Sequence, residues 1–208
     1  NGSPSQVKKA LKEGANVHAR QKDGSTALMA AAGSNKDPEV LKVLMDHGAK
    51  LAPSNSKGMT VLMIAATFNS NPKVIETLLD AGAKVNIHGS SYDITPLILA
   101  SSKNENANVV KRLLDGGADP NATMKHGDTA LMAAAAKNNN PKVTEVLIEA
   151  GADVNAKNEE GVTPLLIATG KSNSPKVVEF LLDAGADPMA TTDKGVSVYQ
   201  VIQHNDQL

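Results

Sequence analysis

The sequence predicts an all-α repeat solenoid, in which pairs of short helices are joined by hairpin-like fingers. Three features recur in phase: a threonine followed two residues later by leucine, a Gly-Ala pair, and an asparagine-and-proline phrase such as "NNNPKV" at 138–143. The threonines lie 34 or 35 residues apart, at Thr26, Thr60, Thr95, Thr129 and Thr163, and Ser197 takes the next position. A fixed period of roughly 20–50 residues is the sequence signature of stacked repeats.

The first helix of each repeat is expected to begin at the recurring threonine. Threonine is a favourable N-cap because its side-chain oxygen accepts a hydrogen bond from the first helical turn. Apolar stretches such as "ALMAAA" and "PLLIAT" follow it directly. Pro96 and Pro164 stand at the first helical position, where the missing N–H group costs nothing.

The second helix is expected to begin at the asparagine-and-proline phrase. The aligned N-caps are Asp37, Asn71, Asn106, Asn140 and Ser174. Proline follows four of these caps, and Ala107 is the exception. A glycine at the end of each apolar stretch predicts the left-handed residue that ends a helix, at Gly14, Gly48, Gly82, Gly117, Gly151 and Gly185.

The segment between this glycine and the next threonine reads as a finger. It carries valine or a similar residue, then Asn or Ser, then a second glycine just before the threonine. At the start of the chain, Ser3-Pro4 is in phase with Asp37-Pro38, so we expect the chain to begin at a second helix whose first helix is missing. Residues 195–208 keep Gly195 and predict a single capping helix from about Ser197, because terminal repeats of solenoids are atypical.

These motifs resemble those of the ankyrin repeat family. "GVTPLLIAT", "VVEFLLDAGADP" and "GADVNAK" match the family's first helix, second helix and finger, and the match runs from residue 3 to about 204. Two features depart from the family. The period is 34 rather than 33, with one extra residue in each inter-helix turn. Apolar residues replace the family's histidine after Pro-Leu, which exchanges a polar link between repeats for apolar contact: Met29, Met63, Ile98, Met132 and Leu166.

The repeats divide the chain into one ankyrin-repeat domain over residues 1–208. The predicted parts are a half repeat and finger at 3–23, full repeats at 24–57, 58–92, 93–126, 127–160 and 161–194, and a capping half repeat at 195–208. A tetratricopeptide array also has 34 residues and two helices per repeat, but its signature needs a tryptophan, which this chain lacks.

Composition excludes several classes of partner. With 21 basic and 22 acidic residues the net charge is −1, which argues against nucleic acid and a membrane surface. Cysteine is absent, so thiolate chemistry and disulfides are excluded. We expect a soluble monomer, cytoplasmic or, if an upstream signal was removed, exported.

The candidate motifs for chemistry are weak. "ATGKS" at 168–172 has Leu165 where a phosphate-binding loop needs glycine, which favours an inter-helix turn. His88 and His126 stand on neighbouring fingers, but a metal site needs three or four ligands. Asn121 fits a glycosylation pattern, yet it occupies a recurring finger position that favours a structural role. We therefore predict no catalytic residue, no metal and no cofactor.

The sequence favours a non-catalytic scaffold that binds another protein. Ankyrin repeats, as the resemblance implies, bind partners with the fingers and the exposed face of the first helices. Two alternatives stay open: a structural spacer or regulatory module of a larger chain, and a small-molecule or metal-dependent enzyme.

The predicted binding residues lie in positions chosen neither for capping nor for the core. Apolar and aromatic side chains concentrate there in the second and third repeats, which is typical of interfaces. The set is Met59, Phe68, Tyr92 and Ile94, with Lys103 and His126 beside them. Lys137 and Lys171 continue the line of Lys103 one repeat apart. The competing interpretation is that Met59 and Ile94 pack finger against finger.

Overall fold

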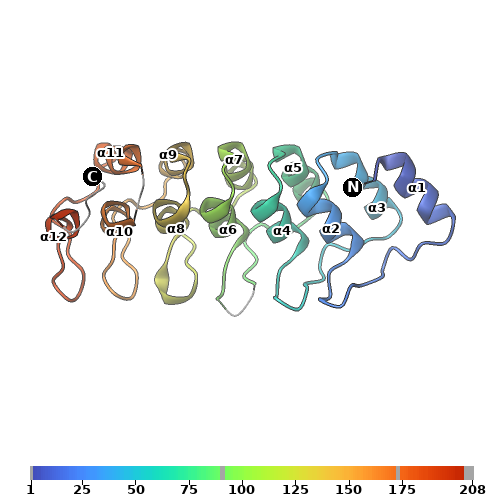
Figure 1. Cartoon of the computed structure of the whole chain (residues 1–208), viewed down its shortest axis with the longest axis horizontal. Helices are drawn as coiled ribbons and strands as arrows, with labels where there is room; N and C mark the ends of the chain where they lie inside the picture. Colours follow the sequence, from blue (N-terminus) through green and yellow to red (C-terminus); the bar gives the residue numbers. More distant parts are fainter. Residues whose placement is uncertain (1, 90–91, 172–173, 204–208) are drawn as a thin grey trace.

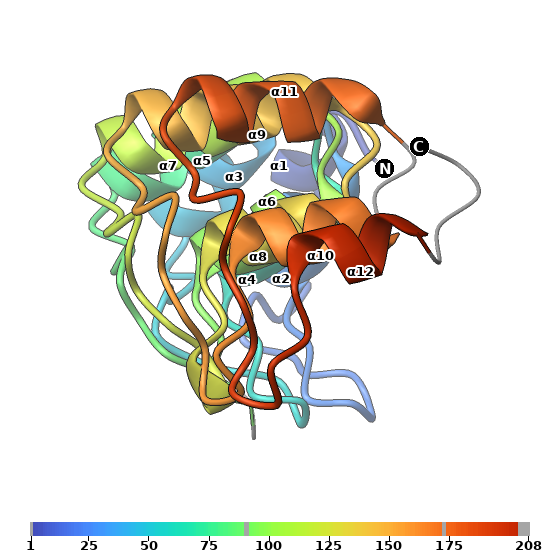
Figure 2. The ribbon, with the colours of Figure 1, turned by 90° about the vertical axis from the view of Figure 1, so that its left-hand side faces the viewer.

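The computed structural model describes residues 2–89, 92–171 and 174–203 of the chain, with the side chain of Lys171 outside the description. These residues form twelve α-helices in two layers, with fingers projecting on the side of the first helices (Figures 1 and 2). The first helices are α2 (Ala27–Ser34), α4 (Val61–Phe68), α6 (Pro96–Lys103), α8 (Ala130–Lys137), α10 (Pro164–Lys171) and α12 (Val198–Gln203). The second helices are α1 (Pro4–Lys12), α3 (Pro38–Asp46), α5 (Pro72–Asp80), α7 (Ala107–Asp115), α9 (Pro141–Glu149) and α11 (Pro175–Asp183). The predicted all-α solenoid is confirmed.

The helix starts follow the predicted caps. Thr60 accepts a hydrogen bond from the N–H of Met63 at 3.3 Å, and the other four recurring threonines cap their helices in the same way. Asn71 accepts from the N–H of Lys73 at 3.0 Å, and Asp37, Asn106 and Asn140 repeat this bond. Ser174 also takes its predicted N-cap position at the start of α11, although its side chain makes no capping hydrogen bond there.

The fingers leave the second helices at glycine, and among the described residues all but the fifth finger return to the first helices through a single bridge. The glycine after each second helix has φ between +86° and +95°, a region that L side chains rarely adopt. At the base of a finger, isolated bridges join pairs such as Ser54 with Thr60 and Thr123 with Thr129. In the third finger Asp93 stands where the others have glycine, and it adopts φ +54°. A short 3₁₀ turn, η1 (Lys125–Gly127), forms the tip of the fourth finger.

A ladder of buried asparagines connects the inter-helix turns. Asn69 donates from Nδ2 to the carbonyls of Ala32 and Asn35, both at 2.8 Å, and accepts from the N–H of Asn71 at 2.9 Å. Asn104 and Asn138 repeat all three bonds one repeat further along. The acceptors lie at the end of the preceding first helix, where carbonyls have no partner within the helix. This ladder supplies polar links between repeats that the sequence did not predict.

A second ladder connects the fingers. Asn121 donates from Nδ2 to the carbonyl of Gly151 at 3.1 Å and accepts from the N–H of Asp153 at 2.8 Å. Asn86 and Asn155 make the equivalent bonds to the fingers that follow them. The structural interpretation of Asn121 is therefore confirmed.

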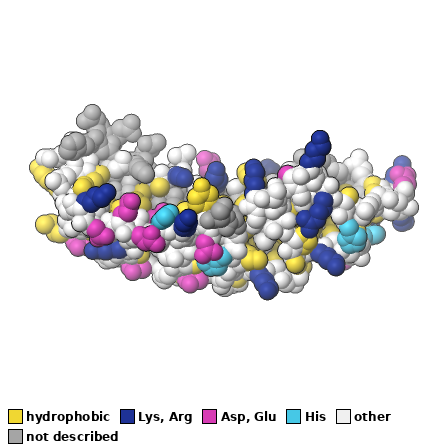
Figure 3. Space-filling view, turned by 90° about the horizontal axis from the view of Figure 1, so that it is seen from below, with side chains coloured by type: hydrophobic (Ala, Val, Ile, Leu, Met, Phe, Trp, Pro, Cys, Tyr) yellow, Lys and Arg dark blue, Asp and Glu magenta, His cyan; other side chains and the backbone are white. Residues whose placement is uncertain are grey.

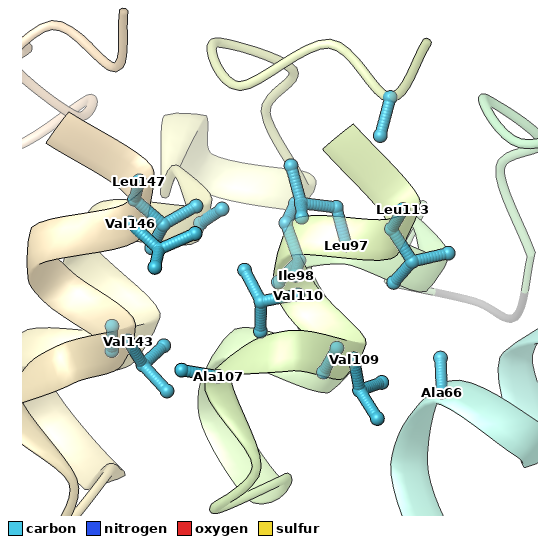
Figure 4. Close-up of a cluster of buried hydrophobic side chains, with 14 of the residues drawn as sticks. Ala66, Leu97, Ile98, Ala107, Val109, Val110, Leu113, Val143, Val146 and Leu147 are labelled. Carbon is cyan, nitrogen blue, oxygen red and sulfur yellow. The ribbon is translucent and has the colours of Figure 1, made fainter. Parts of the chain in front are cut away.

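The core lies between the two layers and continues from repeat to repeat. Figure 4 shows its centre, where Leu97 and Ile98 of α6 lie near Val110 and Leu113 of α7. The apolar residues that replace the family's histidine are at most 4% exposed: Met29, Met63, Ile98, Met132 and Leu166. The predicted apolar contact at this position is confirmed.

The predicted capping helix is α12, and deleting this helix tests its role as a cap. Ser197 caps it through bonds with Gln200, and Val198 is buried against the preceding repeat. Deleting residues 197–208 should expose the apolar face of α10, so we expect a lower melting temperature and aggregation in light scattering. Deleting only 204–208 is the control, because it retains α12. An unchanged melting temperature with monomeric behaviour after the longer deletion would contradict this role.

Candidate functional site

A groove opens between α2, α4 and the first finger. It has a volume of about 430 Å³ and is lined by Gln21, Ser25, Met29, Ala30, Gly33, Ser34, Ile64 and Phe68. The floor is apolar, while the amide and hydroxyl side chains lie on the finger and at the end of α2. Such a combination of apolar surface and a few polar groups is typical of binding sites.

Gly33 determines how closely α4 approaches α2. A Cβ atom at Gly33 would lie 2.9 Å from Cγ2 of Ile64 and 4.0 Å from Cβ of Phe68. The equivalent residues of the next three first helices are Thr67, Ser102 and Ala136, which all carry a side chain. Glycine therefore allows Ile64 to pack against the backbone of α2 beside the groove.

Phe68 and Tyr92 are the predicted binding residues with the most exposed apolar surface. Phe68 is the last residue of α4, and 68% of its surface is exposed although it lines the groove. Tyr92 is 62% exposed at the tip of the third finger, where its carbonyl accepts from the N–H of Lys125. Large apolar surface that remains in water favours a contact role at both residues.

Met59 and Ile94 are half-buried and do not line the groove. Ile94 packs against the core and exchanges two backbone hydrogen bonds with Gly89, each 3.0 Å long. Met59 is held by its backbone bonds with Asn55. The contacts of Ile94 favour a packing role, whereas those of Met59 are made by its backbone within its own finger.

Lys103 and His126 are exposed and also lie outside the groove. His126 Nδ1 is 3.1 Å from Oε2 of Glu159 on the next finger. Lys103 ends α6 and Lys137 ends α8, and neither forms an ion pair with another described residue. Lys171 was predicted to extend this line, but its side chain lies outside the described part of the chain.

The comparison with protein families agrees with this geometry. A model described as ankyrin repeats in three copies matches residues 1–88 and 95–192. The chain belongs to the ankyrin repeat family. A search of curated proteins finds no match to this ankyrin chain.

The motifs that suggested other chemistry have structural explanations in the ankyrin fold. Residues 168–171 of the "ATGKS" motif lie in the last turn of α10, so they form no glycine-rich loop. His88 Nδ1 faces Oδ1 of Asp93 on its own finger at 3.4 Å, rather than His126. Among the described residues, no three His, Cys, Asp or Glu side chains gather as a potential metal site. Every helix in the described ranges is too short or too polar to cross a bilayer.

Of the six predicted binding residues, only Phe68 lines the ankyrin groove, and the structure adds residues that the sequence analysis missed. Met29 was predicted to be a core residue. It is buried, and it also lines the groove. Ala30, Ile64 and Gly33 were not singled out. Gly33 carried a signal, because glycine at that position differs from the side chains of the three repeats that follow.

Proposed function

We propose that this ankyrin chain is a non-catalytic scaffold that binds another protein through the groove and the neighbouring fingers. Ankyrin repeats are generally protein–protein interaction modules. The observation that carries the proposal is Phe68, which keeps an exposed aromatic ring beside an apolar groove. A ring in this place can be buried by a partner, and aromatic anchors supply much of the energy of interfaces.

The alternatives predict different behaviour. A spacer or regulatory module of a larger chain needs no exposed aromatic anchor. An enzyme needs convergent polar groups, whereas the groove offers two hydroxyls and one amide around an apolar floor. We expect the chain to act as a monomer, since the groove lies within one copy.

The double variant Phe68→Asp with Tyr92→Ala tests the proposal. Exposed positions usually change the free energy of unfolding by only about 0.5 kcal/mol, so the variant should melt as the wild type does. Anchors lost from an interface centre cost about 2 kcal/mol or more each, so partner binding should fall by more than tenfold. The measurement is affinity capture from the native source with mass spectrometry, followed by titration of the captured protein.

The matched control is Leu182→Asp with Tyr199→Ala. These residues are 44% and 68% exposed, and they lie on α11 and α12, away from the groove and outside the fingers. The control should retain the partner that the first variant loses. If the first variant folds and binds the partner as tightly as the wild type, the proposed site is refuted. If it melts at a much lower temperature than the wild type, Phe68 and Tyr92 belong to the core.

A further inference from the structure

The fingers carry a charge gradient along the solenoid. Fingers 1 to 6 span residues 14–25, 48–59, 82–94, 117–128, 151–162 and 185–196, and their net charges, counting Lys, Arg, Asp and Glu, are +1, +2, 0, −1, −2 and −1. Fingers 1 and 2 together hold four basic residues and one acidic, whereas fingers 5 and 6 hold two basic and five acidic. Figure 3 shows this row from the fingertips, with magenta side chains gathered toward the C-terminal end and dark blue ones prominent toward the N-terminal end. The chain as a whole is nearly neutral, so the gradient is a property of the finger row.

Backbone hydrogen bonds hold these charges in a fixed row. The carbonyl of Asp23 accepts from the N–H of Ser56 at 2.8 Å, and that of Glu160 accepts from Asp193 at 3.1 Å. Repeats stack at about 10 Å, so fingers 2 and 5 are separated by about 30 Å. This exceeds the screening length of about 8–10 Å at physiological salt, so the two ends act on a partner independently.

Among the described residues, no ion pair neutralises the basic side chains of fingers 1 and 2, and only Lys57 interacts electrostatically with the one acidic residue there, Asp23. Arg20 donates from Nη1 to the carbonyls of Gly24 and Ser54, not to a carboxylate. Lys22, Lys50 and Lys57 form no ion pair with any other described residue. These side chains are exposed and available to a partner.

We propose that the finger row selects a polypeptide segment of asymmetric charge and binds it in one orientation. The acidic part of the segment lies over fingers 1 and 2. A large apolar side chain of the same segment lies next to it in the groove, because Gln21 and Ser25 of finger 1 line that groove. A basic part lies over fingers 5 and 6, about nine extended residues away at about 3.3 Å per residue. The basic first fingers would attract a nucleic acid, but the acidic last fingers would repel it. This inference names the partner chemistry of the site under Proposed function and rests on it.

A random peptide display library, selected on the whole folded chain, tests the inference. The recovered peptides should combine a large apolar residue with nearby acidic residues, and their binding should weaken as salt rises. Lys22→Glu with Lys57→Glu should weaken the best peptide about tenfold. Lys73→Glu with Lys176→Glu is the control, because it makes the same change in net charge at exposed positions of the outer helices α5 and α11. A nitroxide on the acidic end of the peptide should broaden amide signals of fingers 1 and 2, not of fingers 5 and 6.

The outcomes separate this inference from the proposed function. If the peptides no longer bind the Phe68→Asp variant but bind the two charge variants equally well, the charge selection is overturned. The groove would then still stand as a binding site. Broadening at fingers 5 and 6 by the acidic end would overturn the orientation. A selection that recovers no peptide above background overturns both.

Discussion

Replacing Asn138 with alanine is expected to lower the free energy of unfolding by about 3 kcal/mol. The side chain donates to the carbonyls of Ser101 and Asn104 at 2.8 and 3.1 Å and accepts from the N–H of Asn140 at 2.9 Å. Asn138, Ser101 and Asn104 are buried, so alanine leaves polar groups without a partner and out of reach of water. Each unpaired buried polar group costs about 1–3 kcal/mol. Equilibrium urea denaturation measures the loss.

Asn139→Ala is the matched control in the same phrase. Asn139 is exposed, and its side chain bonds to no other described residue. The same change of residue type should therefore alter the free energy of unfolding by no more than about 0.5 kcal/mol. Equal losses in the two variants would show that the ladder does not hold the repeats together.

Replacing Leu113 with alanine is expected to lower the free energy of unfolding by about 3–4 kcal/mol. Leu113 is fully buried in α7, among the clustered side chains drawn in Figure 4. Removing its branched end leaves a cavity, and the helices of neighbouring repeats are held by several other contacts and cannot close it completely. Because each repeat contacts only its neighbours, a central loss also weakens the link between the two halves of the solenoid. Urea denaturation and hydrogen exchange across α5 to α9 would record both effects.

Leu182→Ala provides the comparison for Leu113. Leu182 is an exposed leucine of a second helix, so the same truncation removes little buried surface. We expect a change within about 0.5 kcal/mol. If Leu113→Ala were equally mild, the core would not be continuous through α7.

The helices could be predicted from the sequence because their signals are local. The oxygen of Thr60 and the N–H that it caps are only three residues apart. Pro72 is itself the first residue of α5, so it marks the start of that helix directly. Ser174 occupies the N-cap position of α11 without a side-chain capping bond. Ser3 and Ser197 do make such bonds at α1 and α12, so the residue type fixes the position of the cap but not the bond.

The asparagine ladder could not be predicted in the same way. Asn71 and its equivalents were correctly assigned as caps, yet Asn69, Asn104 and Asn138 were treated only as part of the turn. Their acceptors lie 34 to 38 residues earlier in the chain, so the bonds exist only once neighbouring repeats are stacked. A recurring asparagine shows that a polar group is needed, but not where its partner lies.

The groove is likewise a property of stacking. Phe68 could be singled out because an aromatic residue occupies a position that the repeat exposes. Its neighbours Ala30 and Gly33 come from the preceding repeat, and only the approach of Ile64 to Gly33 brings them together. Met59 and Ile94 occupy the same repeat position in adjacent fingers, and both are half-buried there.

Hydrogen–deuterium exchange of the chain with and without its captured partner tests the central claim most directly. Binding through the groove and fingers predicts slower exchange in residues 20–34 and 56–68, which contain the first two fingertips, α2 and α4. The outer layer, including α5 (Pro72–Asp80) and α7 (Ala107–Asp115), should exchange as in the free chain. Slower exchange confined to the second helices, with residues 20–34 and 56–68 unchanged, would contradict binding at this face.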